Sequence, residues 1–466
     1  MSEAASTTHA GNETDLKSLA AEVVARAVKA GATDIEAVVS EGDEFSVSVR
    51  MGEVETLQES GSRGMGLRVF VGQRSASAST SDLTPDGIAQ LVSGAMALAR
   101  VTEEDSFAGL PDEADFGQLQ DDLHLYFEDV YSLPAAERID RARQAEAAAL
   151  AFDSRITNSQ GGHFDAATGR RVLANSRGFL GEYRTSYCGI SAAPLAMDAD
   201  GAMQRDFWSS SARRIADLES PESIGQEAAR RALRRLGARR VPTQNVPIIF
   251  APEVARSLIG HLFEAASGDS IWRSASFLAG QLGQAIAAPN LTLIDDHTML
   301  LPAGVGGFGT SPFDGDGLPT RRTIVVQDGV LQTYLLNTYT ARKLKMRSTG
   351  NATRGLTGSP GIGAGNLYLV PGSETPEALI TAVSSGFYVT SLMGFGANLV
   401  TGDYSRGASG LWIENGELTH AVEEVTIAGN LREMLLNITA VANDLIFRGS
   451  VTAPTLRVDG MTVAGA

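Results

Sequence analysis

The side chains of this 466-residue sequence best suited to metal or proton chemistry are six histidines and a few closely spaced carboxylates. No two histidines lie four residues apart. The one suggestive pair is His261 and Glu264, which would share a helix face at a spacing of three. Two donors do not hold a catalytic zinc, which normally takes three protein ligands and a water. We therefore expect His261 and Glu264 to make an ordinary contact at a surface or an interface.

Other catalytic motifs are incomplete. Adjacent carboxylates occur at Asp295 and Asp296 and at Glu423 and Glu424, but neighbouring residues of a strand point to opposite faces, so neither pair forms a shared acid/base site by itself. No serine lies in the GxSxG elbow of a hydrolase. The glycine-rich segment 304–317 lacks the GK[ST] ending of a phosphate-binding loop and is not followed by a helix.

The N-terminal half is predicted to combine helices with antiparallel strands. Apolar residues recur at helical spacing over 15–30, 85–100 and about 135–152, and Gly31 stands where a glycine would end the first helix. Period-two alternation predicts strands over 34–60, 64–80 and 156–197. The arginine-rich segment 222–237 is predicted as a helix with a solvated basic face, and the acidic segment 102–122 as an exposed connection.

A domain boundary is expected at 241–245, where Pro242 ends the basic helix and a buried strand follows. Beyond it we expect helices near 252–266 and 276–287 and then mostly strands, with hairpin turns at QDG (327–329) and ENG (414–416). The predicted fold class is α+β, with a β-rich, barrel-like C-terminal domain. The expected divisions are a disordered tail at 1–14, α+β subdomains at 15–110 and 111–240, and the C-terminal domain at 241–466.

Composition argues against several classes of protein. A formal charge of −17 and a pI near 4.9 disfavour nucleic acid as a partner, because phosphate binding needs clustered lysine and arginine. No apolar run is long enough for a membrane span, and the N-terminus has no apolar signal region. The single cysteine, Cys188, cannot close an intrachain disulfide, which suits the reducing cytoplasm. We expect Cys188 to be buried filler.

Three long segments of the C-terminal half resemble the TldD/TldE (PmbA) peptidase family more than any generic β-rich domain. They are FAPEVARSLIGHLFEAASGDSIWRSASFLAGQLG, SPFDGDGLPTRRTIVVQDGVLQTYLLNTYTARKLKMRSTGNA and LMGFGANLVTGDYSRGASGLWIENGELTHAVEEVTIAGNLREML. The segments SGSRGMGLRVFVGQRSASAST and ITNSQGGHFDAATGRRVLANSRGFLGEYRTSYC are similar to the same family. The resemblance extends from about residue 15 to residue 444.

In that family the TldD component carries an HExxxH zinc motif on a helix of the C-terminal domain, with a cysteine further along the chain. The resemblance places these three motif positions at Ile259, Gly260 and Glu264, and the cysteine position within 392–396, which contains no cysteine. The sequence is therefore similar to the TldE/PmbA-type subunit, whose signature TGDYSRGASGLWIENGE is present at 401–417. The resemblance implies no catalytic residue and no metal in this chain, with zinc on the partner subunit.

The resemblance further implies a cytoplasmic heterodimer with a TldD-like catalytic subunit that processes unfolded peptides such as leader peptides or antitoxins. The isolated chain could also form a homodimer. Two alternatives stay open: a self-sufficient hydrolase that uses carboxylates such as Glu264 and Asp403, and a regulatory protein that only binds peptides. Extended peptides can add to glycine-rich strands through backbone hydrogen bonds.

Polar residues between the predicted C-terminal strands are the candidates for lining a shared substrate cavity or bracing its loops. They are Arg347, Asn351, Asp403 and Arg406, together with His261 and Glu264 on the helix that corresponds to the zinc helix of the partner. An equally good interpretation is that Asp403 and Arg406 only staple a turn.

Overall fold

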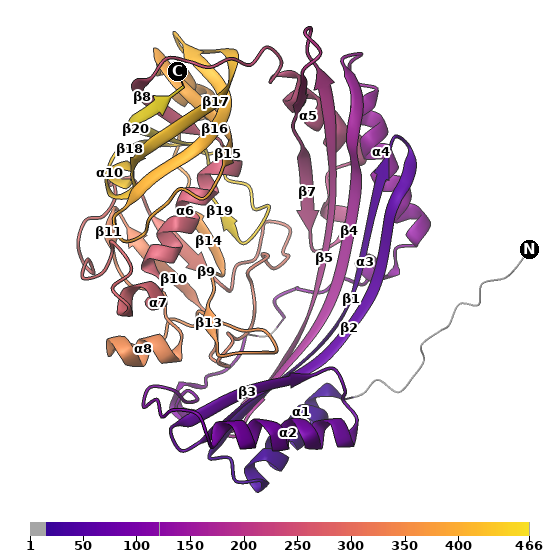
Figure 1. Cartoon of the computed structure of the whole chain (residues 1–466), viewed down its shortest axis with the longest axis vertical. Coiled ribbons are helices and arrows are strands. Elements are labelled where there is room, and N and C mark those ends of the chain that lie inside the picture. Colours follow the sequence, from indigo (N-terminus) through magenta and orange to yellow (C-terminus); the bar gives the residue numbers. More distant parts are fainter. Residues whose placement is uncertain (1–14, 121, 466) are drawn as a thin grey trace, which may run out of the picture.

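The computed structural model describes residues 15–120 and 122–465, and the tail predicted at 1–14 lies outside this range. Figure 1 shows a long, curved sheet on one side of the molecule and the C-terminal half on the other. Helices and antiparallel sheets occur together, and the C-terminal half contains a closed barrel, so the predicted α+β fold class is confirmed.

The N-terminal half is built from helices at the two ends of one sheet. Its elements are α1 (Leu16–Lys29), β1 (Asp34–Arg50), β2 (Glu53–Val71), β3 (Arg74–Thr80), α2 (Pro85–Ala99), α3 (Glu128–Ser132), α4 (Ala135–Leu150), β4 (Ile156–Asn175), β5 (Leu180–Met197), β6 (Met203–Arg205), β7 (Trp208–Ala212) and α5 (Pro221–Leu233).

The sheet runs in the order β3-β2-β1-β4-β5-β6, with β7 also paired to β5, and all of its pairings are antiparallel. It therefore continues through both of the segments 15–110 and 111–240. The predicted first helix is present as α1: the Asp15 side chain accepts from the Lys17 N–H at 3.1 Å, and Gly31 follows with φ +97°.

Alternation along β1 places two cores on one face of the sheet. Near its start, Ile35, Ala37 and Val39 are buried against α1 and α2. Further along, Phe45, Val47 and Val49 belong to a second core under α4 and α5. All these residues have odd numbers, as a period of two requires. The even-numbered Glu36 and Val38 face the opposite side, where the C-terminal half packs.

The acidic segment predicted at 102–122 as an exposed connection is in part buried, because Leu110 and Pro111 are buried among its described residues. It runs along α8 (Thr338–Leu344) of the C-terminal half, and Leu110 is fully buried. The Arg342 guanidinium donates to the Leu110 carbonyl at 2.6 Å, and the Tyr339 hydroxyl donates to the Asp105 carboxylate at 2.9 Å. The connection is therefore held to the C-terminal half by polar contacts that its own composition does not reveal.

The C-terminal half begins with β8 (Gln244–Phe250) and α6 (Pro252–Ala266). The elements that follow are α7 (Gly268–Trp272), β9 (Leu293–Asp296), β10 (Arg322–Gln327), β11 (Val330–Leu331), α8, β12 (Ala352–Thr353), β13 (Gly361–Ile362), β14 (Asn366–Leu369), α9 (Pro376–Thr381), β15 (Ser385–Met393), β16 (Asp403–Glu414), β17 (Glu417–Asn430), α10 (Leu431–Leu436), β18 (Ile438–Val441), β19 (Val451–Thr452) and β20 (Leu456–Ala464).

Five strands close into a barrel in the order β17-β16-β15-β8-β20, with β20 paired back to β17. A second sheet runs β11-β10-β9-β14-β19. The helix α6 contacts both, through β15 on the barrel and β14 and β19 on the second sheet. It is therefore enclosed by sheet on more than one side, and its position is fixed by packing.

Both hairpin turns predicted from QDG and ENG are confirmed. Asp328 and Gly329 join β10 to β11 with φ +49° and +80°, and Asn415 and Gly416 join β16 to β17 with φ +52° and +82°. Two positive φ angles in succession are the requirement of the hairpin turn that Asp-Gly and Asn-Gly favour.

The helix predicted near 276–287 is wrong, because this segment forms turns. Gly280 and Gly283 have φ +76° and +78°, which a helix cannot accommodate. The backbone bonds to the β10–β11 hairpin instead: the Gly283 N–H donates to the Leu331 carbonyl and the Ile286 N–H to the Gly329 carbonyl, both at 2.8 Å. Helical apolar spacing is present in the sequence, but the neighbouring hairpin offers the backbone better partners.

Glycines of the segment 304–317 serve close packing. A Cβ at Gly309 would lie 2.2 Å from the Gly365 backbone, so no side chain fits there. Arg213, which follows β7, donates to the carbonyls of Gly306 and Gly307 at 2.8 and 2.7 Å. The segment therefore joins the two halves through its backbone.

Cys188 is fully buried on β5, which confirms the sequence-based expectation. Burial raises the pKa of its thiol to about 12, so it stays protonated and unreactive near neutral pH. None of the helices in the described ranges is long and apolar enough to cross a membrane.

A buried ionic cluster joins the sheet to the C-terminal half. The Glu36 carboxylate of β1 has no exposed surface and lies 2.5 Å from the Arg68 guanidinium of β2 and 2.6 Å from that of Arg354. The Arg171 guanidinium of β4 donates to the Arg354 carbonyl at 2.6 Å. Three chain segments distant in sequence therefore meet at one carboxylate.

Glu36→Gln should destabilise the protein by about 3–5 kcal/mol, because it leaves two buried guanidinium groups without their counter-charge. The matched control is Glu424→Gln, which breaks the exposed pair with Arg240 and should cost no more than about 1 kcal/mol. The free energy of unfolding is measured by urea titration of both variants. Equal losses in the two would contradict the structural role of Glu36.

Candidate functional site

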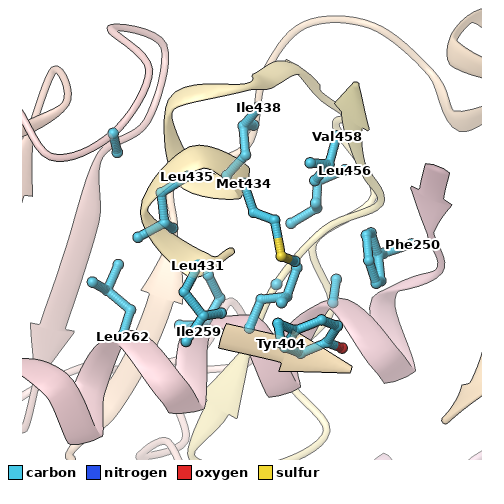
Figure 2. Close-up of a cluster of buried hydrophobic side chains, with 14 of the residues drawn as sticks. Phe250, Ile259, Leu262, Tyr404, Leu431, Met434, Leu435, Ile438, Leu456 and Val458 are labelled. Atoms are coloured by element: carbon cyan, nitrogen blue, oxygen red, sulfur yellow. The ribbon is translucent and has the colours of Figure 1, made fainter. Parts of the chain in front are cut away.

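The helix α6 starts with Pro252 at its first turn, followed by Glu253, as a helix N-terminus favours. Its apolar stripe enters the core of the C-terminal half, where Ile259 and Leu262 pack near Tyr404, Leu431 and Met434 (Figure 2). Ile259 has no exposed surface. This apolar stripe fixes which residues of α6 face inward and which face outward.

The three positions matched to the family zinc motif do not fit a zinc ion. Ile259 is a buried aliphatic side chain, Gly260 has no side chain and open space where a Cβ would lie, and the Glu264 side chain is 60% exposed. A hydrolytic zinc needs nitrogen, sulfur or oxygen donors on three sides and an activated water on the fourth. One exposed carboxylate supplies a single donor, so no hydrolytic step through zinc follows from these residues.

His261 and Arg406, both singled out from the sequence, come together with Tyr404. The His261 and Tyr404 rings meet edge to face with centroids 6.2 Å apart. Burial lowers the pKa of His261, and the nearby Arg406 lowers it further against an opposing effect of Glu264. Burial also raises the pKa of Tyr404 to about 12. The imidazole is therefore neutral, and the phenol protonated, near neutral pH.

These three side chains carry unsatisfied polar atoms. His261 Nε2, the Tyr404 hydroxyl and Arg406 Nε are buried, and none has a hydrogen-bond partner within the described residues. Buried polar groups normally find partners, so a group of three without them marks a place where a ligand or another chain can complete the bonding. Tyr404 was not singled out from the sequence, although it lies between Asp403 and Arg406 in the same signature.

Glu264 and Asp403 lie at the edge of this group. The Glu264 carboxylate is 3.9 Å from His261 Nδ1, at the limit of an ion pair. The exposed Asp403 carboxylate accepts from the Thr401 hydroxyl at 2.7 Å, in the turn before β16. Asp403 thus braces that turn, whereas Arg406, three residues along the strand, points to its other face.

Asn351 belongs to a different cluster. It is fully buried, and its side chain lies between the end of β9 and the backbone near Gly363. Its amide nitrogen lies 2.6 Å from the Asp295 carboxylate and 3.1 Å from His297 Nε2, and it donates to the Gly363 carbonyl at 2.9 Å. His297 borders a cavity of about 350 Å³ that also reaches β5. Asn351 therefore holds a buried carboxylate in place.

Arg347 lies at the surface, with 92% of its side chain exposed and an ion pair to Asp115 at 3.3 Å. The side chains of Arg347 and Asn351 are thus in unlike environments although they are four residues apart. The turn at Gly350, with φ +77°, lies between them and redirects the chain inward.

The prediction of a solvated basic face on the arginine-rich helix is wrong in part. Arg230 is exposed and pairs with Glu227, but Arg231 is buried and pairs with Glu253 of α6 at 2.8 Å. Arg231, Arg234 and Arg235 line a cavity between α5 and α6. Their spacing of three and four residues, which puts them on one helix face, is the sequence signal that could have identified them.

Three family models cover most of the chain. Residues 35–99 match domain 1 of the PmbA/TldA metallopeptidases, residues 128–236 match their central domain, and residues 243–465 match their C-terminal domain.

Individual proteins agree with these matches. The chain is 39% identical over 430 residues to Metalloprotease PmbA of Escherichia coli O157:H7, with 92% of each chain covered. It is 36% identical over 455 residues to the Metalloprotease PmbA homolog of Haemophilus influenzae, with 97% of each covered. Among solved structures, a protein of Bacteroides thetaiotaomicron superimposes with a TM-score of 0.89 at 28% identity, covering 97% of this chain and all of that one. The fold also matches TldE from Thermococcus kodakarensis, with a TM-score of 0.85 at 20% identity, covering 96% of this chain and 100% of that one.

Asn351→Ala should destabilise the protein by about 2–4 kcal/mol, because it removes a hydrogen-bond donor from the buried Asp295 carboxylate. Arg347→Ala is the matched control and should cost less than about 0.5 kcal/mol, since its side chain is solvated. Thermal unfolding of both variants measures the difference. A stable Asn351→Ala protein would show that this cluster is not needed for the fold.

Proposed function

This chain belongs to the PmbA/TldD metallopeptidase family, and on that premise we propose that it is the non-catalytic subunit of a two-subunit zinc peptidase. A TldD-like partner binds the zinc and cleaves. This subunit helps to hold unfolded peptides, of which leader peptides and antitoxins are the expected kinds. The proposal places both subunits in the cytoplasm.

The observation that carries this proposal is the environment of the three zinc-motif positions on α6. Ile259 completes the apolar packing of the helix, and Gly260 leaves no donor. The helix is otherwise intact and well packed, so it serves a purpose other than zinc ligation. A chain that keeps the packed helix but has no zinc ligands at these positions is expected to contribute to the complex through its surface.

The self-sufficient hydrolase has less support. It would need two carboxylates that share one reacting group, but Glu264 is exposed beside His261, and Asp403 is bound to Thr401. The second alternative, a regulatory protein that only binds peptides, is distinguished by a peptide-cleavage assay.

A surface suited to the partner lies beside the His261–Tyr404–Arg406 group. In the segment 393–400, Met393, Phe395 and Val400 are largely exposed, and the Phe395 side chain is entirely so. Ala397 forms a β-bridge with Tyr404, and the Leu399 carbonyl accepts from the Phe277 N–H at 2.7 Å, which holds the segment next to the core around α6. Aromatic side chains that protrude in this way are typical anchors of protein interfaces.

The chain, a TldD-like protein and their mixture should differ in peptide cleavage and zinc content. We expect cleavage of an unstructured peptide only in the presence of the TldD-like protein, and stoichiometric zinc only in that protein after dialysis. Peptide cleavage is followed by mass spectrometry and zinc by elemental analysis. One tightly bound zinc per copy of this chain would overturn the proposal, and peptide binding without any cleavage in the mixture would favour the regulatory protein.

Phe395→Asp should weaken assembly with the partner by about 2 kcal/mol or more, roughly thirtyfold in Kd, because it replaces an apolar anchor with a charge. Leu57→Asp is the control, since Leu57 is an exposed apolar residue of β2 in the N-terminal half. Sedimentation velocity over a concentration series gives both constants. An unchanged Kd for Phe395→Asp would move the interface elsewhere.

A further inference from the structure

A cavity of about 620 Å³ lies between the two halves of the chain. One wall comes from β6, β7 and the end of α5, and the other from the start of α6, β15, β16 and the connection 444–453. A volume of this size accommodates several residues of an extended peptide or one small molecule.

The cavity is basic although the chain is strongly acidic. Seven arginines and three carboxylates line it, a formal excess of four positive charges in a protein whose net charge is −17. The arginines come from five separate elements, β6, α5 with the turn after it, α6, β16 and the 444–453 connection. A local basic site on an acidic molecule repels long polyanions at a distance but attracts a carboxylate that enters it.

Some of these arginines are already neutralised. Arg231 pairs with Glu253 at 2.8 Å, and Arg448 pairs with Glu219 at 3.0 Å. The Trp208 ring lies near both, with the guanidinium carbons 4.6 and 4.1 Å from its centroid. These contacts hold the walls of the cavity in place, because a guanidinium packed on an aromatic face loses little freedom when it binds.

Three others are not neutralised. Arg234, Arg256 and Arg406 have no salt-bridge partner in the described ranges, and the Nε atoms of Arg234 and Arg406 are buried without a hydrogen-bond partner there. Burial lowers the pKa of Arg234, and neighbouring Arg231 lowers it further. Arg234 and Arg406 are half-buried and Arg256 is exposed, so an anion that enters the cavity can supply the counter-charge that these guanidinium groups lack among the described residues.

The remaining lining suits a peptide better than a simple inorganic anion. Phe207 and Ile446 are more than half exposed at the cavity, and Trp208 and Tyr388 add aromatic surface. Among the described strands, β7 pairs only with β5, and Figure 1 shows it on the side of the sheet nearest the C-terminal half. An edge strand can pair with an extended peptide backbone, while the apolar side chains take alternate residues.

We propose that this cavity binds carboxylates of the peptide substrate, so that the complex prefers peptides with an acidic segment. Arg234, Arg256 and Arg406 are the groups that receive the carboxylates. The inference deepens the proposed function and rests on it for the identity of the ligand as a peptide. The carboxylates are those of Asp and Glu side chains in that segment.

Binding of fluorescent unstructured peptides to the isolated full chain tests the proposal. The probes are a peptide with four glutamates, the same peptide with glutamines, and C-terminally amidated forms of both. We expect the glutamate peptide to bind about tenfold or more tightly than the glutamine peptide. If amidation alone removes binding, the cavity recognises the peptide C-terminus and not an acidic segment, which would overturn the proposal. Equal binding of all four peptides would overturn the proposal.

Arg234→Gln and Arg256→Gln should each weaken binding of the glutamate peptide about tenfold and leave the glutamine peptide unchanged. Arg256 is exposed, so its variant is expected to fold even if the Arg234 variant does not. Arg230→Gln is the control, because Arg230 lies on the outer face of α5 and should have no effect. Full binding by both cavity variants would overturn the proposal, as would competition by inorganic phosphate with no preference among the peptides.

The same peptides in the cleavage assay with the TldD-like partner separate this inference from the proposed function. Cleavage without preference for the glutamate peptide would leave the two-subunit peptidase standing and overturn the cavity proposal. Preferential binding of the glutamate peptide by the chain, with no cleavage by the mixture, would support the cavity and overturn the peptidase.

Discussion

The arrangement of the two halves depends on the fully buried carboxylate of Glu36, which binds arginines from both of them. It lies on the even-numbered face of β1 and meets Arg68 of the next strand and Arg354 of the C-terminal half. A carboxylate in such a place is tolerated only when cations surround it. The odd-numbered face of β1 is committed to helices α1, α2, α4 and α5, so the even-numbered face is the one left for the C-terminal half. Because side chains alternate between the two faces of a strand, β1 can pack against helices on one face and against the C-terminal half on the other.

The way in which the two halves pack against each other also forms the cavity between α5 and α6. At the cavity between α5 and α6, Arg231 of one half pairs with Glu253 of the other. The helix α6 takes part in both the cavity and the His261–Tyr404–Arg406 group, since Glu253 and Arg256 line the cavity and His261 belongs to the group. One helix thus connects the His261–Tyr404–Arg406 group to a basic cavity. A chain without zinc donors at the zinc-motif positions of α6 still uses the helix in its core and in the wall of the cavity.

Charge is distributed unevenly over the molecule. The acidic excess is spread over the chain as a whole, whereas arginines from distant segments gather at two interior places, the Glu36 cluster and the α5–α6 cavity. In the first, guanidinium groups are matched to a carboxylate within the chain. In the second, several guanidinium groups outnumber their partners. The first arrangement stabilises the fold, and the second is suited to binding an anion from outside.

The sequence by itself determined the local elements and the family. Asp15 and Gly31 bound the first helix, the Asp-Gly and Asn-Gly turns produce their hairpins, and Pro252 begins α6, because each depends on residues near one another in the chain. The tertiary structure decided the rest. The segment 276–287 has helical apolar spacing but forms turns, because its backbone bonds to a hairpin more than forty residues away, as the Gly283–Leu331 hydrogen bond shows. Asn351 is buried and Arg347 exposed, and Arg231 faces a cavity while Arg230 faces solvent. Burial and counter-charges come from segments distant in sequence, and no local pattern encodes which of those segments will meet.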